Sequence, residues 1–136
     1  MKLFPLPTIA LAAAALFAGG CSSAKPALQP KQTQGTLTAD FATQPAPPRV
    51  GHDTAFVLTL ADSGQPVTGA QVEVATSYLS FSEQQGPTVQ LMEAAPGHYE
   101  AREVSTGLQG KWEAHVTVAR PGHPEAKFTF PFSVAK

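Results

Sequence analysis

Asp62, His98 and His123 are the residues of this chain whose types could form a metal site. Each lies in or beside a stretch rich in Gly, Pro or Ser. Together they would offer two nitrogens and one oxygen, a set that suits a borderline metal ion. Met92 is the only methionine besides the initiator, so a thioether copper site would need a second molecule or added histidines. The alternative, which we adopt, is three separate solvated side chains, and we assign no cofactor.

Catalytic motifs are the next feature to consider. The sequence has no Gly-x-Ser-x-Gly elbow, no Gly-rich phosphate loop and no His-Glu-x-x-His motif. Glu100 and Glu103 could act as paired carboxylates, but their spacing puts them on opposite faces of a strand. We therefore expect that the protein is not an enzyme.

The sole cysteine, Cys21, follows an export-type segment. Lys2 precedes an apolar run over residues 9–18, which is too short to cross about 30 Å of hydrocarbon. Ala18 and two glycines then lead directly to Cys21. The segment resembles the lipobox of bacterial lipoproteins, although Ala18 stands where the lipobox usually has Leu. The resemblance implies that Cys21 becomes the mature N-terminus and carries a diacylglyceryl group and fatty acids such as palmitate. The alternative is an ordinary secretory signal with a chance cysteine.

The chain accordingly divides into three parts. Residues 1–20 are expected to be a signal peptide, and residues 21–34, without aromatic side chains, a flexible tether. Residues 35–136 are expected to be one folded domain. We therefore expect the protein to lie in the cell envelope, where it would be lipid-anchored on the periplasmic or extracellular side. Ser22 after the cysteine favours the outer membrane if the host is Gram-negative.

Composition limits the partners. The chain has 136 residues, of which 43% are hydrophobic, and a formal net charge of −1. One modest core is the expected outcome. The near-neutral charge provides no footprint for nucleic acid and no polybasic segment for anionic lipid.

The elements that position these residues have the period of strands. Apolar and polar residues alternate in segment after segment, and helical periodicity is not seen after the signal. Residues 95–97 should close a hairpin, and Pro131 should place its strand at a sheet edge or bulge. The pattern predicts an all-β fold, a seven-stranded antiparallel immunoglobulin-like β-sandwich. The expected strands are residues 35–43, 54–60, 70–76, 88–94, 98–104, 111–119 and 126–135.

That strand order also places the metal candidates. His98 and His123 would lie in loops at one end of the sandwich, and Asp62 would lie at the same end. His115 would lie mid-strand in the sheet opposite His98, and His52 at the far end. Only the first three could therefore act together.

Four short segments carry a family resemblance. They are residues 49–51 (RVG), residues 62–72 (DSGQPVTGAQV), residues 97–101 (GHYEA) and residues 110–112 (GKW). In this order they are similar to the YtkA-like and FixH-like domains of bacterial envelope proteins, over about residues 35–136. The resemblance implies an immunoglobulin-like sandwich without known enzymatic activity. It also implies a link to copper or heavy-metal handling and to respiratory oxidase assembly. Many relatives carry a Met-rich run where this chain has YLSFSEQQ at residues 78–85.

Three hypotheses follow for function. The first is a membrane-anchored, non-catalytic module that binds another envelope protein through a sheet edge or through the segment from Tyr78 to Phe81. Its criterion is that both aromatic side chains are exposed on one surface. The second is a periplasmic accessory protein for copper or heavy metals. The third, an enzyme or small-ligand binder, would require a deep polar pocket.

Overall fold

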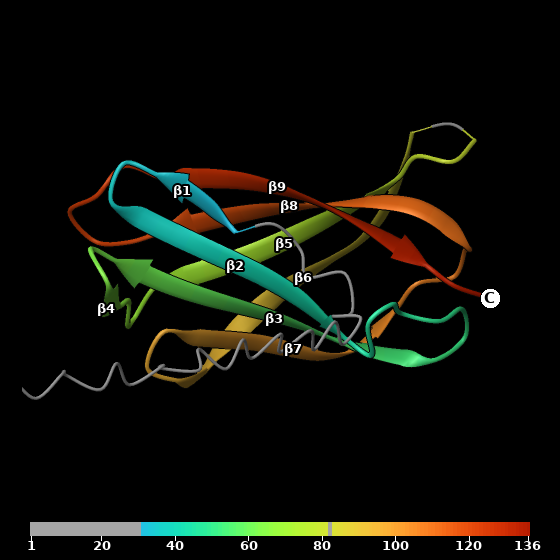
Figure 1. The fold of residues 1–136 in the computed structure, drawn as a ribbon, viewed down its shortest axis with the longest axis horizontal. Helices are drawn as coiled ribbons and strands as arrows, with labels where there is room; N and C mark the ends of the chain where they lie inside the picture. Colours follow the sequence, from blue (N-terminus) through green and yellow to red (C-terminus); the bar gives the residue numbers. More distant parts are fainter. Residues whose placement is uncertain (1–30, 82) are drawn as a thin grey trace, which may run out of the picture.

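The structure, a computed structural model, describes residues 31–81 and 83–136. Within these residues the chain forms nine strands, coloured along the sequence in Figure 1. No helix among them has the length and hydropathy needed to cross a membrane. The strands are β1 (Gln32–Gln34), β2 (Leu37–Gln44), β3 (Asp53–Asp62), β4 (Gln65–Pro66), β5 (Gln71–Tyr78), β6 (Gln84–Ala95), β7 (His98–Ser105), β8 (Gly110–Ala119) and β9 (Ala126–Val134).

All strand pairs are antiparallel, and their order is β1-β2-β3-β7-β6-β5-β8-β9, with β4 paired to β3. The seven longer strands correspond to the seven predicted from the sequence. The all-β sandwich class is therefore confirmed. The two additional strands, β1 and β4, are only three and two residues long.

Strand β6 joins the two layers of the sandwich. Its first part pairs with β5 as far as Leu91, and its last part, from Met92, pairs with β7. The predicted hairpin connects β6 to β7, and Gly97 adopts a φ of 77° in its turn. A side chain there would meet the Leu60 carbonyl oxygen at 2.9 Å, so the turn requires glycine. One bent strand thus belongs to both layers.

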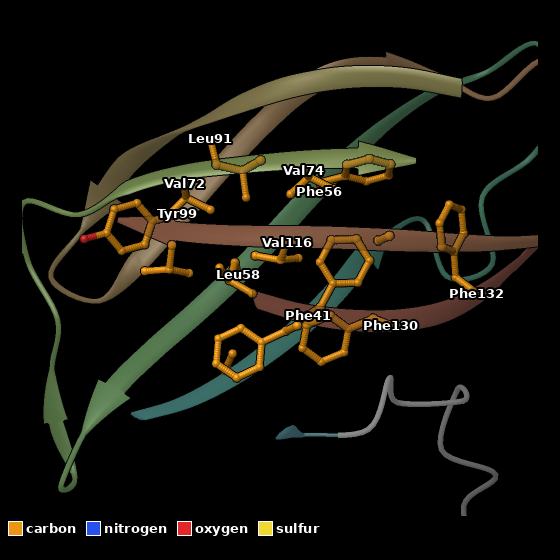
Figure 2. Close-up of a cluster of buried hydrophobic side chains, with 14 of the residues drawn as sticks. Phe41, Phe56, Leu58, Val72, Val74, Leu91, Tyr99, Val116, Phe130 and Phe132 are labelled. Atoms are coloured by element: carbon orange, nitrogen blue, oxygen red, sulfur yellow. The ribbon is translucent and has the colours of Figure 1, made fainter. Parts of the chain in front are cut away.

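The core lies between the layers and follows the alternation seen in the sequence. Phe41 on β2 contacts Phe56 on β3, with ring centroids 5.4 Å apart. It also reaches across to β9, where the centroids of Phe130 and Phe132 lie 5.5 and 6.3 Å away. Figure 2 shows these rings beside the aliphatic side chains of the core. The aromatic cluster therefore holds the first strands of the chain against the last.

Tyr99 is the buried polar anchor of the core. Its hydroxyl donates a hydrogen bond to the Val67 carbonyl oxygen at 2.8 Å and accepts one from the Ala70 amide at 3.1 Å. Burial raises the pKa of the Tyr99 hydroxyl above its ordinary value. Tyr99 thereby fixes the segment between β4 and β5, whose backbone groups would otherwise lack these partners.

Strand β9 lies at the end of the strand order, which confirms the prediction from Pro131. The segment before β3 pairs with Ala135, the residue that follows β9. The Ala135 amide donates to the Pro48 carbonyl oxygen at 2.8 Å, and the Val50 amide donates to the Ala135 carbonyl oxygen at 3.0 Å. This end of the edge is therefore not available to another strand.

Strand β1 corrects the predicted boundary between tether and domain at residue 35. The side-chain amides of Gln32 and Gln34 donate to the Thr129 and Lys127 carbonyl oxygens of β9. The three residues of β1 also pair with β2. The hydrophobic pattern could not reveal this strand, because it is held by amide hydrogen bonds rather than by an apolar face. The described fold therefore begins before Gly35.

A bulge in β7 corrects the expectation for the paired carboxylates. Glu103 has a φ of 59°, and the pairing of β7 with β3 shifts between Thr54 and Phe56. The extra residue turns Glu103 outward and gives the inner position to Val104. Simple alternation puts Glu100 and Glu103 on opposite faces of β7. Beyond the bulge this prediction is wrong, because Glu103 is exposed.

Candidate functional site

Asp62, the first of the metal candidates, is held by two neighbours. Its Oδ1 accepts a hydrogen bond from the Thr36 hydroxyl at 2.6 Å, and Arg120 Nη1 lies 2.9 Å from its Oδ2. The Thr36 hydrogen bond and the bond from Arg120 hold the pKa of the Asp62 carboxyl below its ordinary value, with a smaller contribution from His123. The carboxylate therefore links the end of β3 to the β8–β9 loop.

The two histidine candidates have their own surroundings. His98 Nδ1 lies 3.3 Å from the Thr59 hydroxyl, and the ring is exposed. His123 is exposed in the β8–β9 loop, where its amide donates to the Arg120 carbonyl oxygen at 3.2 Å. No three His, Cys, Asp or Glu side chains gather as a ligand group in residues 31–81 and 83–136. Within this part of the chain, Asp62, His98 and His123 do not form a joint site.

The other two histidines lie apart from these. His115 lies on β8, in a different set of paired strands from His98, with its ring 3.3 Å from the hydroxyls of Ser77 and Thr129. His52 immediately precedes β3, at the end of that strand opposite to Thr59 and His98. Both positions agree with the sequence prediction.

The aromatic segment after β5 meets its exposure criterion only in part. Tyr78 is buried, with 4% of its surface exposed, whereas Phe81 is 91% exposed. Leu79 and Leu108 are also exposed. Figure 1 shows the β5–β6 hairpin extending beyond the rest of the sandwich. We call Leu79, Phe81 and Leu108 the tip patch.

Hydrogen bonds connect the base of this hairpin to the β7–β8 loop and the start of β8. The predicted segment from Tyr78 to Phe81 included Leu79, but sequence reasoning had not placed Leu108 at the site, because the contact joins segments some thirty residues apart. The only hint was an apolar residue inside a Gly-rich loop, at residues 107–110 (GLQG). The Leu79 amide donates to the Lys111 carbonyl oxygen (2.8 Å), and the Lys111 amide donates to Ser80 Oγ (2.7 Å). The Tyr78 hydroxyl donates to the Gln109 carbonyl oxygen (3.0 Å), and Trp112 Nε1 donates to the Leu108 carbonyl oxygen (3.0 Å).

Gly86 supports the hairpin from inside, and Gly86→Ala should destabilise the domain by about 1–3 kcal/mol. A Cβ at this position would lie 2.5 Å from Trp112 Cζ3 and closer still to the Thr76 hydroxyl. Neither neighbour can move freely, because Thr76 donates to the Pro87 carbonyl oxygen at 2.8 Å and Trp112 is buried. Chemical denaturation measures the loss.

Gly107→Ala is the matched control for this substitution. A Cβ at Gly107 would meet nothing within 4 Å, so only a small change is expected there. Equal stability of the two variants would contradict the close packing assigned to Gly86.

A shallow hollow of about 340 Å³ opens on the outer side of the β3–β7 pair. It contains the ion pair between Arg102 and Glu100. The third hypothesis would require a deep polar pocket, and this hollow is open to solvent. Its lining is Gln44, Asp53, Thr54, Ala55, Glu100 and Arg102.

The fold and the sequence together define the class of the protein. The YtkA-like family model matches residues 31–117, and the chain belongs to the YtkA-like family. The match includes β1 through most of β8, together with the hairpin that carries Phe81. The resemblance seen in the short motifs is thereby confirmed.

Two solved structures have a similar fold. A DUF4426 family protein from Pseudomonas aeruginosa PAO1 matches with a TM-score of 0.56 and 16% identity, over 78% of this chain and 96% of that one. The PmoD soluble domain from Methylocystis sp. ATCC 49242 (Rockwell) matches with a TM-score of 0.53 and 8% identity, over 79% and 97% of the two chains. No curated protein gives a significant sequence match. At these identities the two structures support the fold alone.

Proposed function

We propose that this YtkA-like chain is a lipid-anchored accessory module of the bacterial cell envelope that binds a partner protein through its tip patch. The observation that carries the proposal is the exposure of Phe81, 91%, on a hairpin whose base is fixed by hydrogen bonds. A large aromatic ring held in water by a rigid support is typical of an anchor residue in a binding interface. The module does no catalysis in this proposal.

The chemistry of the tip favours a protein with an apolar pocket. Residues 78–86 and 106–110 contain no Lys or Arg, so the tip has none of the basic groups that attract anionic lipid. Phe81 would insert into the partner, and the exposed Leu79 and Leu108 would add apolar contact area. Because the base is already ordered, little conformational entropy is lost on binding.

The anchoring part of the proposal rests on Cys21 and the lipobox-like segment before it. These residues lie outside the described part of the chain. Ser22, in place of Asp, supports the outer membrane as the destination in a Gram-negative host. Anchoring would confine the module to the envelope and so raise its effective concentration near other membrane proteins.

Phe81 provides the direct test. A photo-crosslinking amino acid at position 81 of the full-length protein, in its own membranes, should give a discrete protein adduct. Against that purified partner, Phe81→Ala should weaken binding about 30-fold, as expected for an anchor residue worth about 2 kcal/mol. Titration calorimetry or surface plasmon resonance measures the loss.

Met92 is the matched control, because it is apolar and 72% exposed but lies away from the hairpin tip, at the end where β6 pairs with β7. The same crosslinker at position 92 should give no such adduct, and Met92→Ala should bind normally. Adducts to lipid alone at position 81 would contradict the proposal. Titration with Cu(I), Cu(II) and Zn(II) tests the metal-handling alternative, which would be favoured by binding tighter than about micromolar.

A further inference from the structure

The edges of the two layers differ in how they are protected against pairing with other strands. The outer edge of β9 is covered by Pro48–Val50 and by the amides of Gln32 and Gln34. The free part of β7 carries Arg102 and Glu103 and is distorted by a bulge. Charges, bulges and covering segments are the usual means by which proteins block edge-to-edge association. These edges are therefore closed to a partner strand.

Strand β6 has an edge without such protection. Between Thr88 and Leu91 it pairs with β5 on one side, and among the described residues no strand pairs with its other side. Pro87 protects only the beginning of this stretch. The next four residues, 88–91 (TVQL), contain neither a charge nor a proline. Four neutral residues on an unpaired strand edge are an open template for another strand.

We propose that this β6 edge pairs antiparallel with the β6 edge of a second copy of the chain, about a two-fold axis. Two-fold pairing places a stretch opposite itself, so any charged residue in it would approach its own copy. Residues 84–91 (QQGPTVQL) contain no charge, whereas the free part of β7 and strand β9 both do. Side chains such as Thr88 and Gln90 can both donate and accept hydrogen bonds, which suits a self-complementary contact.

Such a dimer would extend one layer of the sandwich across two molecules. The continuous order would be β9-β8-β5-β6 followed by the same four strands of the second copy in reverse. The pairing uses few residues, so the interface is smaller than that of a stable dimer and exchange should be reversible. It leaves Phe81 exposed in both copies, so the dimer does not depend on the function proposed for the tip patch.

Sedimentation velocity on residues 22–136, which contain every described strand and the whole core, tests the proposal. The dimer fraction should rise between about 10 µM and about 1 mM protein. Thr88→Glu should weaken association at least tenfold, because Thr88 is exposed on this edge and two-fold pairing would bring the new charge close to its own copy. Ser133→Glu, an exposed position on the covered strand β9, should not.

A mixing experiment distinguishes pairing from a folding defect. Thr88→Lys should also weaken self-association, but an equimolar mixture of Thr88→Glu and Thr88→Lys should recover the dimer by opposite charge. A monomer at every concentration would overturn the proposal. Equal losses in Thr88→Glu and Ser133→Glu, or no recovery on mixing, would also overturn it.

Discussion

Phe41→Ala is expected to lower the free energy of unfolding by about 3–5 kcal/mol. The ring is fully buried and lies against three others, Phe56 from its own layer and Phe130 and Phe132 from the opposite one. Removing it leaves a cavity between the layers that the rigid strands cannot close. Domains of this size are stable by about 5–15 kcal/mol, so the loss is a large part of the total. Urea denaturation followed by Trp112 fluorescence measures it.

Phe81→Ala is the control for Phe41→Ala. It removes the same ring from a position that is 91% exposed, so stability should change by less than about 0.5 kcal/mol. Phe41→Leu should cost less than Phe41→Ala, because the smaller volume change leaves a smaller cavity. Equal losses at positions 41 and 81 would show that the aromatic cluster does not hold the layers together.

Cys21→Ala is expected to remove the protein from the membrane fraction almost completely. Each buried methylene contributes about 0.8 kcal/mol, so the two or three acyl chains of a lipoprotein give stable anchoring that one chain cannot. Without the thiol the diacylglyceryl group has no attachment point. Fractionation of cells and mass spectrometry of the mature N-terminus measure the change.

Ser22→Ala serves as the control, since it keeps the thiol and changes only the following residue. This variant should remain in the membrane and retain its lipid. If Cys21→Ala fractionates like the unchanged protein, the lipid anchor proposed here is wrong.

The period-two alternation predicted the long strands and, outside the β7 bulge, the inner faces named for them correctly. Trp112, Val116 and Phe130, for example, are buried as the pattern requires. The pattern succeeds because a strand buried on one face must place alternate side chains in the core. Pro131 likewise indicated an outer strand, because a missing amide donor is tolerated at an edge.

Features held by contacts between distant segments could not be predicted in this way. Strand β1 depends on glutamine amides that reach β9, and the outward position of Glu103 depends on a bulge in the register with β3. The bend of β6 arises because its two parts pair with different layers. None of these leaves a periodic signal in the local sequence.

The candidate site likewise combines features that the local sequence indicates with features that only the structure reveals. The sequence prediction includes Tyr78 in an exposed binding segment, but Tyr78 continues the inward series of Val72, Val74 and Thr76 in a strand that runs two residues further than expected. Phe81 comes after the strand ends, where parity has no meaning, and its exposure required the structure. The ends of the sandwich that carry Asp62 and the histidines were predictable, but the partner of Asp62 was not, because Arg120 lies 58 residues away.

The closure of the fold by its two ends has a consequence for the time course of folding. Gln32 contacts a strand 97 residues further along the chain, and Arg49 forms a parallel bridge with Ala135. Neither contact can form until nearly the whole chain has been synthesised. Folds dominated by such distant pairings form in milliseconds to seconds rather than microseconds. If a chain crosses a membrane before it folds, its strand edges therefore stay uncovered until β9 has been completed.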